Sequence, residues 1–351
     1  MQELITGIQQ VGIGVENAAE AKYLYRDLFG MDVLVFDDTA QASLMTKYTG
    51  HQVHSRRAIL SMNMQGGGGF EIWQFLSRTP GKLPINSYAG EPGLLAIKIK
   101  SNNVKKAQEY FSGNQRIQVS PVYHLSDGRP ACWIIDPYGN RFQLIEAAEF
   151  FKKTNHYCGG VIGAIIGVSD MEASLSFYKN LLGISDESYN IRTKGNAGLE
   201  PWSEGESLHK ILLTKNASVS GAFSKLLGHA ELELVQPITK KYAVDKANRF
   251  WGDCGFIHLC FDVLDMDLLK LRAEAAGYLF TVDSADAYRM ESAEGRFCYI
   301  EDPDGTLIEL VETHKVPVLK KLGWYINLIK RKKNKPLPDW MVGLLSLNKV
   351  K

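Results

Sequence analysis

The residues of this chain best suited to chemistry are one histidine and two glutamates in its second half. In the predicted strand 257–263 every odd-numbered position is bulky and apolar, so His258 points to the opposite face. Glu309 lies in another predicted strand and shares its face with apolar side chains, and Glu233 lies between two leucines. A carboxylate in such surroundings must find a cation or become protonated, because an unpaired buried charge is very costly.

We therefore predict that Glu233, His258 and Glu309 are metal ligands. One imidazole and two carboxylates suit Zn, Mn, Ni, Co or Fe(II), and they leave coordination positions for water and substrate. The alternative is that His258 is a hydrogen-bonded core residue and that Glu231 and Glu233 edge a solvated face.

Two turns of the type Asp-Pro-x-Gly, at residues 136–140 and 302–306, show that the chain repeats itself. Asp-Pro starts a turn and the glycine supplies the positive φ that closes it, so each turn predicts a β-hairpin. A polar residue that faces inward follows each turn, Gln143 in the first copy and Glu309 in the second. The two copies can therefore be compared position by position.

The elements that must position these residues repeat as well. Each half opens with a strand and a helix that ends at a glycine, Gly30 in the first half and Gly183 in the second. A smaller strand–helix unit follows in each half, at 96–111 and 258–277. The sequence thus predicts four βαβββ modules arranged as two pairs, with residues 147–160 as the link.

These openings, the two hairpins and the strands 70–74 and 232–237 together resemble the vicinal oxygen chelate superfamily. That superfamily includes glyoxalase I, bleomycin resistance proteins and extradiol dioxygenases. The resemblance implies an α+β fold, with four βαβββ modules paired into two curved mixed-sheet half-barrels, or cups, and helices on the convex faces. It also implies a first glyoxalase-like domain at 1–147 and a second at 148–314. The remaining residues, 315–351, form a basic amphipathic tail outside the resemblance.

In this superfamily the first and last strands of the modules hold a divalent metal. The matching positions are Gln10, Glu71, Ala96 and Gln143 in the first domain, and Gly163, Glu233, His258 and Glu309 in the second. Ala96 has no donor atom, amides are poor ligands, and Lys98 or Arg141 can neutralise Glu71, so we expect a degenerate site in the first domain. We expect the active site in the second domain, with the first ligand missing at Gly163.

The resemblance leaves three functions open. The favoured one is a metal-dependent lyase or isomerase, in which the metal polarises a small oxygenated substrate and Glu233 moves the proton. The runner-up is an Fe(II) extradiol ring-cleavage dioxygenase. Tyr299 lies close to that family's signature around Glu309 and is a second candidate catalytic residue, although the family needs two histidines. The third is a resistance-type protein that binds a small molecule without turnover.

Composition bounds the remaining properties of the chain. Five cysteines without a CxxC pair argue against a disulfide framework and a cysteine-only zinc site. The sequence shows no basic leader and no long apolar run, which favours a soluble, cytoplasmic protein. No nucleic-acid recognition motif is present. The expected partner is a small-molecule substrate, and the oligomeric state stays open.

Two segments outside the modules carry predictions of their own. Residues 192–229 are a long insertion, which we predict to be a lid over the cup that contains His258. The tail contains ten Lys/Arg and one acid, so it is a candidate for contact with a membrane surface or an acidic partner. The alternative, which we favour, is a C-terminal helix that docks on the domains through Leu319, Leu322, Ile326 and Ile329.

Overall fold

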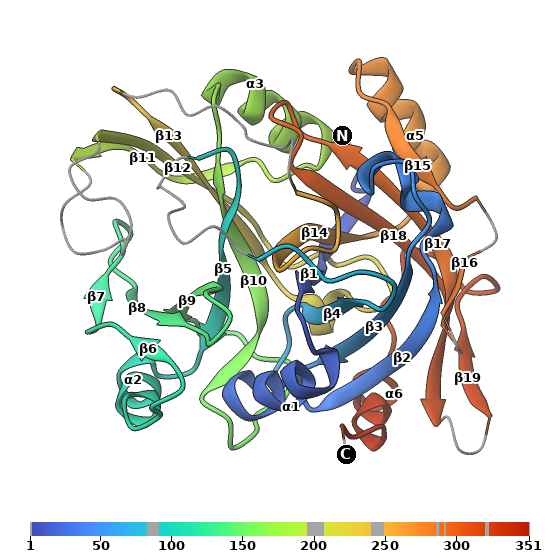
Figure 1. Ribbon diagram of the computed structural model, residues 1–351, viewed down its shortest axis with the longest axis horizontal. Coiled ribbons are helices and arrows are strands. Elements are labelled where there is room, and N and C mark those ends of the chain that lie inside the picture. Colours follow the sequence, from blue (N-terminus) through green and yellow to red (C-terminus); the bar gives the residue numbers. More distant parts are fainter. Residues whose placement is uncertain are drawn as a thin grey trace.

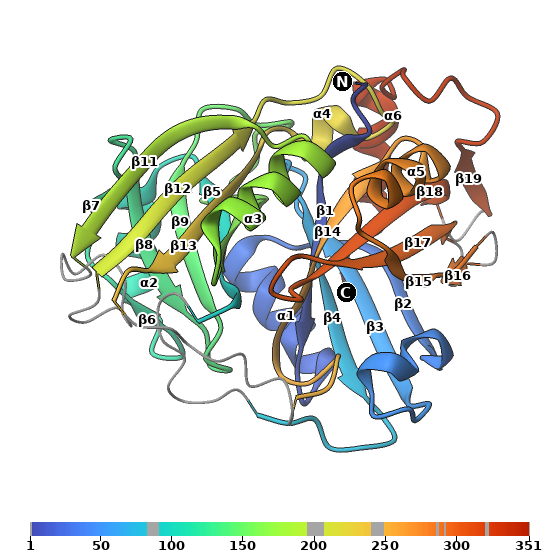
Figure 2. The ribbon, with the colours of Figure 1, turned by 90° about the horizontal axis from the view of Figure 1, so that it is seen from above.

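The computed structural model describes residues 2–82, 91–194, 207–239, 249–285, 288–290, 293–319 and 323–350. Their strands form two mixed sheets that lie side by side, with helices packed against them (Figures 1 and 2). The predicted fold class is confirmed: the protein is α+β, and its sheets are built from paired βαβββ modules.

Four modules follow one another along the chain. The first comprises β1 (Ile5–Gly14), α1 (Ala18–Phe29), β2 (Val33–Gln41), η1 (Ser43–Tyr48), β3 (Ser55–Met62) and β4 (Gly69–Phe75). The second comprises β5 (Gly93–Ser101), α2 (Val104–Ser112), β6 (Gln118–Val119), β7 (Tyr123–His124), β8 (Pro130–Ile135) and β9 (Arg141–Glu146). The third comprises β10 (Cys158–Gly167), α3 (Met171–Ser176), η2 (Phe177–Leu181), β11 (Asp186–Lys194), β12 (Ser207–Lys215), α4 (Ser224–Leu227) and β13 (Ala230–Pro237). The fourth comprises β14 (Gly255–Val263), α5 (Met266–Ala275), β15 (Phe280–Asp283), β16 (Tyr288–Met290), β17 (Ala293–Glu301) and β18 (Leu307–Leu319).

The first helix of every module begins at a side chain that caps it. The capping residues accept a hydrogen bond from backbone N–H groups of the first turn, and they are Asn17, Asn103, Asp170 and Asp265. Gly30 ends α1 in the left-handed conformation with a φ of 65°. The repeat that the sequence shows is thus a repeat of local structure.

The two sheets combine modules from opposite halves of the chain. One has the strand order β15-β17-β18-β14-β1-β4-β3-β2 and joins the first and fourth modules; we call its concave side the outer-module cup. The other has the order β11-β12-β13-β10-β5-β9-β8-β6 and joins the second and third modules; its concave side is the inner-module cup. In each sheet the two modules meet through an antiparallel pair, β1 with β14 and β10 with β5.

This pairing corrects the predicted organisation, in which 1–147 and 148–314 each close a cup. The two modules within each half of the chain are still in contact. A tyrosine hydroxyl in the helical segment of one module donates a hydrogen bond to the aspartate of the hairpin in the next module. Tyr25 Oη lies 2.7 Å from Asp136 Oδ2, and Tyr178 Oη lies 2.8 Å from Asp302 Oδ2. Unpaired strand edges accept any complementary strand, so the pattern of a repeat does not select which modules pair.

The two sheets approach each other closely at the glycine run before β4. Gly68 N donates to Val161 O at 2.7 Å, and Val161 N donates to Gly68 O at 2.9 Å. A Cβ atom on Gly67 would lie 2.7 Å from the backbone carbon of Gly160. Glycine is needed here because two backbones come into contact.

The tail begins as a strand, so the predicted helix through 319–329 is wrong. β18 runs on to Leu319 and pairs with β19 (Trp324–Asn327), which contains the buried Ile326. Leu322 lies outside the described residues. Pairing with the edge of β18 outweighs the weak helical spacing, as tertiary context commonly does.

The end of the tail docks on the outer-module cup. It forms α6 (Asp339–Gly343) and the 3-10 turn η4 (Leu344–Leu347). Val342 and Leu345 are buried in a cluster with Val33, Met62 and Leu226. The tail thus packs on the folded modules through apolar side chains, and none of the described helices is long and apolar enough to cross a bilayer.

Candidate metal centre

Glu71, His258 and Glu309 meet in the outer-module cup. His258 Nε2 lies 3.3 Å from Glu71 Oε2 and 3.1 Å from Glu309 Oε2. One potential ligand atom from each residue lies within 4.8 Å of the others. Their exposed fractions are 2%, 0% and 6%, so the cluster is closed to bulk water. Among the described residues, this is the one group of three His, Cys, Asp or Glu side chains with such spacing.

Neighbouring central strands bring these side chains together. Gly12 of β1 is aligned with Glu71 of β4 on one side and with His258 of β14 on the other. A Cβ atom on Gly12 would lie 2.4 Å from His258 Cε1, so the imidazole fills the space that a side chain would occupy. Glu309 comes from β18, which pairs with β14 in parallel.

Gln10 is a fourth polar side chain at this cluster. Its Nε2 donates to Glu309 Oε2 at 3.1 Å, and its buried Oε1 has no hydrogen-bond partner among the described residues. A side-chain amide has an oxygen acceptor and a nitrogen donor at nearly the same distance from its backbone. Gln10 therefore adds an oxygen donor atom beside the imidazole and the two carboxylates.

The charges of the cluster are coupled. Burial lowers the pKa of His258, but the carboxylates of Glu309 and Glu71 outweigh burial and raise it to about 9. Burial raises the pKa of Glu309, but His258 outweighs it and lowers that pKa. Two buried carboxylates thus demand positive charge, which a protonated imidazole or a bound cation supplies.

The donor set fits a divalent metal. His258 Nε2 contacts both carboxylates without forming a well-directed hydrogen bond, and Glu71 Oε2 also has no hydrogen-bond partner among the described residues. Buried polar atoms are normally satisfied, so converging atoms that are not satisfied point to a missing common partner. One nitrogen and three oxygen donors are a suitable set for Zn, Mn, Ni, Co or Fe(II).

Tyr299 lies on the far side of the imidazole. Its hydroxyl is 3.2 Å from His258 Nδ1, and the side chain is buried. Burial and the Glu309 and Glu71 carboxylates raise the pKa of Tyr299 well above its ordinary value, so the phenol is neutral. A partner on one ring nitrogen fixes the orientation of the other, so Tyr299 positions His258.

Glu233, the third predicted ligand, lies in the other cup. Its carboxylate is 2.8 Å from Lys98 Nζ and 2.8 Å from Lys210 Nζ. The prediction that Glu233 joins His258 and Glu309, and that it moves the proton there, is therefore wrong in its placement. Glu71 and Gln10 supply the carboxylate and the first ligand from the half that we expected to be degenerate, because each cup crosses between the halves.

The complete set was present in the sequence. Taking the first two candidate positions of the first domain with the last two of the second gives Gln10, Glu71, His258 and Glu309. That choice depends on knowing that the first and fourth modules pair, which no residue in the motifs encodes.

The inner-module cup holds an ion network where the outer-module cup holds the cluster. Lys98 is fully buried and contacts both Glu233 and Glu231, the latter at 3.2 Å; Arg129 lies 2.9 Å from Glu231. Burial raises the pKa of Glu233, but Lys210 and Lys98 outweigh burial and lower it. Gln143 donates to the Tyr123 hydroxyl at 2.7 Å. An ammonium group built into the chain thus neutralises these carboxylates.

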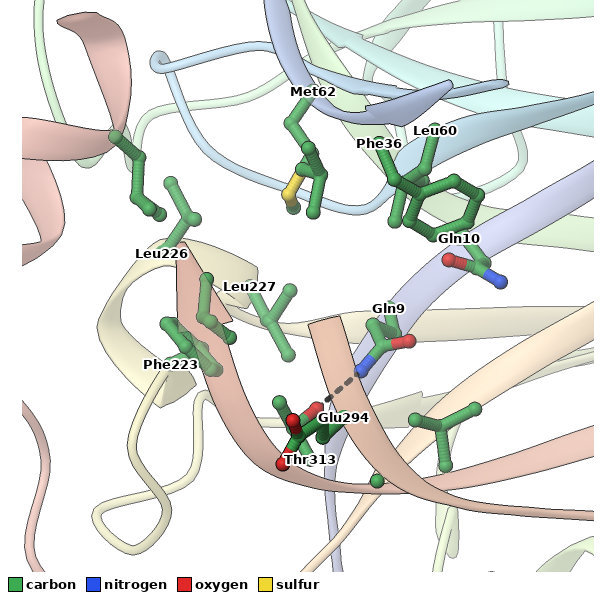
Figure 3. Close-up of a pocket in the computed structure, with 15 residues that line it drawn as sticks. Gln9, Gln10, Phe36, Leu60, Met62, Phe223, Leu226, Leu227, Glu294 and Thr313 are labelled. Carbon is green, nitrogen blue, oxygen red and sulfur yellow. Dashed lines mark hydrogen bonds between the residues drawn. The ribbon is translucent and has the colours of Figure 1, made fainter. Parts of the chain in front are cut away.

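A cavity of about 70 Å³ adjoins the metal centre at Gln10. Figure 3 shows Phe36, Leu60 and Met62 on one side of it and side chains of α4 on the other. Phe223, Leu226 and Leu227 come from the end of the insertion 192–229, so this end of the predicted lid covers the cup that contains His258. The rest of its described part does not, because residues 192–194 belong to β11 and residues 207–215 form β12, both in the sheet of the inner-module cup. Residues 195–206 of the insertion lie outside the described residues.

Aromatic side chains pack at another part of the outer-module cup. The ring centroids of Trp73 and Trp251 are 4.3 Å apart, and both indoles are buried in a cluster with Tyr299.

Comparison with known proteins identifies the class. Residues 154–310 match the model of the Glyoxalase/Bleomycin resistance protein/Dioxygenase superfamily. This match and the fold of the whole chain agree with the resemblance that the motifs carry. No curated protein matches the chain in sequence.

Solved structures share the tandem arrangement. The chain is similar to glyoxalase I from Zea mays at 14% identity and a TM-score of 0.50, over 87% of this chain and 92% of that one. It is also similar to a candidate dioxygenase from Bacillus subtilis subsp. subtilis str. 168 at 14% identity and a TM-score of 0.54, over 89% and 86%. At such identity these likenesses establish the fold and leave the reaction to the site.

Proposed function

We propose that this protein is a divalent-metal-dependent enzyme that catalyses proton transfer, of isomerase or lyase type, on a small oxygenated substrate. The observation that carries the proposal is the buried set of Gln10, Glu71, His258 and Glu309 in one cup, with donor atoms that lack a common partner. If these glutamates had only a structural role, a side-chain cation would be enough to balance their charge, as Lys98 balances the glutamates of the other cup.

The roles of the side chains follow from their contacts. A divalent cation bound there would act as a Lewis acid on a carbonyl oxygen. Glu309 Oε2 is held by Gln10 and His258, whereas the contact of Glu71 at the centre is with His258 alone among the described residues. Glu71 is therefore the better candidate to leave its place and accept a proton from the substrate carbon.

His258 and Tyr299 serve the site in different ways. His258 would hold the metal through Nε2, and Tyr299 contacts Nδ1 and so keeps the ring in place. The apolar wall beside Gln10 excludes water, which strengthens the electrostatic effect of the centre on a bound substrate.

Elemental analysis of protein purified without chelators tests the proposal. We expect about one Zn, Mn, Ni, Co or Fe per chain in the wild type and none in His258→Ala. The matched control is Glu233→Gln, which alters a buried glutamate in the other cup and should keep the metal. Thermal unfolding of each variant shows whether it is folded.

The outcomes separate the alternatives. Iron would favour the extradiol-type dioxygenase, while Zn, Ni or Co would favour the lyase or isomerase. A wild-type protein that stays metal-free after anaerobic reconstitution would reject both enzymes and leave a small-molecule-binding protein.

A further inference from the structure

A second cavity adjoins the one beside Gln10. It has a volume of about 420 Å³ and lies where tail residues run past β14 and β18. The two cavities share Phe223, Glu294, Gly295 and Thr313 in their walls. Figure 3 shows Thr313 and Glu294 beside Gln9 at this boundary, where Gln9 Nε2 donates to Thr313 Oγ1 at 3.1 Å. The apolar inner cavity thus shares part of its wall with an outer cavity that has charged side chains in its wall.

The outer cavity is rich in basic side chains, and most of them come from the tail. The basic residues in its wall are His314, Arg331, Lys332, Lys333 and Lys335. Lys333 lies 2.8 Å from Glu312 Oε1. Within the described part of the chain, Arg331, Lys332 and Lys335 form no ion pair, so their charges are available to a ligand.

The acidic side chains in the same wall are already engaged. Glu312 is paired with Lys333, and Glu294 lies 3.1 Å from Lys315 Nζ. Asp262 accepts a hydrogen bond from the Thr6 hydroxyl. The charge left over in this cavity is therefore positive, and it favours an anionic occupant.

We infer that the substrate of this centre is an elongated small molecule with a short apolar body and an anionic end group, a carboxylate or a phosphate. The inference rests on the proposed function, since the apolar body lies beside Gln10 with the reacting oxygen toward the metal centre. The anionic end lies in the outer cavity, against Arg331, Lys332 and Lys335.

The sizes of the cavities support this division. About 70 Å³ of apolar space accepts a short hydrocarbon group and leaves no room for a hydrated ion. About 420 Å³ of space, with basic side chains in its wall, accepts a charged group together with water. The tail contributes Leu345 to the inner wall and the basic residues to the outer wall, so it acts as the specificity element of the site.

Calorimetric titration with three probes of equal chain length tests the inference: hexanol, hexanoate and hexyl phosphate. We expect the two anions to bind at least about tenfold more tightly than hexanol, and raised salt to remove the difference. The variant Arg331→Ala/Lys332→Ala should lose about tenfold in affinity for the anions and nothing for hexanol.

Two further variants serve as controls. Lys152→Ala/Lys153→Ala removes the same charge from an exposed pair that lines neither cavity, and it should bind all three probes as the wild type does. Leu227→Trp fills the inner cavity and should weaken all three, with thermal unfolding as the check on its fold. Equal affinities for hexanol and hexanoate, or an unchanged Arg331→Ala/Lys332→Ala variant, would overturn the inference.

The same protein distinguishes failure of the inference from failure of the proposed function. Bound metal with no affinity for either anion overturns the inference and leaves the metal enzyme. Anion binding by a protein that holds no metal rejects the metal enzyme. It also rejects the claim that one end of the substrate reacts at the metal centre. Co-sedimentation with phosphatidylserine vesicles is the third arm. Vesicle binding that needs Arg331 and Lys332, with no affinity for hexyl phosphate, would make the patch a membrane contact instead.

Discussion

The two cups place different side chains at the same positions of the same fold. Where the outer-module cup has Gln10, Glu71, His258 and Glu309, the inner-module cup has Gly163, Glu233, Ala96 and Gln143. Each cup keeps a buried glutamate at this position, Glu71 on the last strand of the first module or Glu233 on the last strand of the third. The difference lies in what balances that charge: Lys98 in one cup, and the imidazole and a proposed metal in the other.

The cups also differ in how they fill space. Gly12 is aligned with His258 in one, and Ile165 is aligned with Ala96 in the other. A large and a small residue have exchanged strands, so both cups are packed. A cup that lacks its imidazole thus needs two replacements, a side chain to fill the volume and a cation to balance the charge.

Substitution of a metal ligand should have the largest effect on metal binding, and only ligands of the outer-module cup should show this effect. We expect Glu71→Gln to abolish stoichiometric metal binding and activity, a loss beyond the ~100-fold typical of an outer-shell change. Glu233→Gln should leave metal content unchanged. Metal titration of both variants measures this, and equal losses would show that the cups are not independent.

Removal of Lys98 should destabilise the inner-module cup and leave the metal content unchanged. Lys98→Met leaves Glu231 and Glu233 buried with fewer cations, and we expect the free energy of unfolding to fall by about 3–5 kcal/mol. Denaturant unfolding measures the loss, and elemental analysis should find the metal content of the wild type. A neutral effect on stability would mean that Lys210 and Arg129 suffice.

Asp262 should make stability depend on pH. Burial raises its pKa to about 6, against the hydrogen bonds from Thr6 and Gln9. A carboxyl whose pKa is raised in the folded state stabilises the fold below its unfolded pKa of about 4, and this contribution is lost as pH rises through about 6. The shift corresponds to about 3 kcal/mol.

Unfolding curves between pH 4 and 7 check this prediction. The wild type should lose stability relative to Asp262→Asn across that window, because the amide does not titrate. Parallel pH profiles for the two proteins would contradict it. Lys106→Ala, an exposed change on α2, is the control for general charge effects.

Gly12 should tolerate no side chain. In Gly12→Ala the new methyl would lie 2.4 Å from His258 Cε1, so the imidazole must move. We expect a loss of about 1–3 kcal/mol of stability and a lower metal affinity. Ile165→Val at the aligned position of the other cup should cost about 1 kcal/mol and leave the metal in place.

Tyr299 should give the smallest effect, through His258. Tyr299→Phe removes the partner of Nδ1, and we expect about a tenfold loss of metal affinity with little change in stability. Trp133 occupies the aligned position in the other cup, so Trp133→Phe should not change metal affinity. An unchanged Tyr299→Phe protein would limit this phenol to packing.

Much of the fold and part of the centre follow from the sequence alone. The capping residues, the glycine helix ends and the Asp-Pro-x-Gly turns are local signals, and each acts within a few residues of itself. Strand alternation likewise placed His258 and Glu309 on the concave face, since the direction of a side chain depends on its own strand. These features are encoded where they occur.

The tertiary structure decided which module meets which, and therefore which residues form the centre. Glu71 and Glu233 have equivalent surroundings in their own modules, and no local signal separates the glutamate that meets His258 from the one that meets Lys98. The partner of a strand edge depends on packing across the whole chain, because the backbone groups of all edges are chemically alike. The sequence thus specified four modules and their ligand positions, and the pairing of the first module with the fourth brought Gln10, Glu71, His258 and Glu309 together.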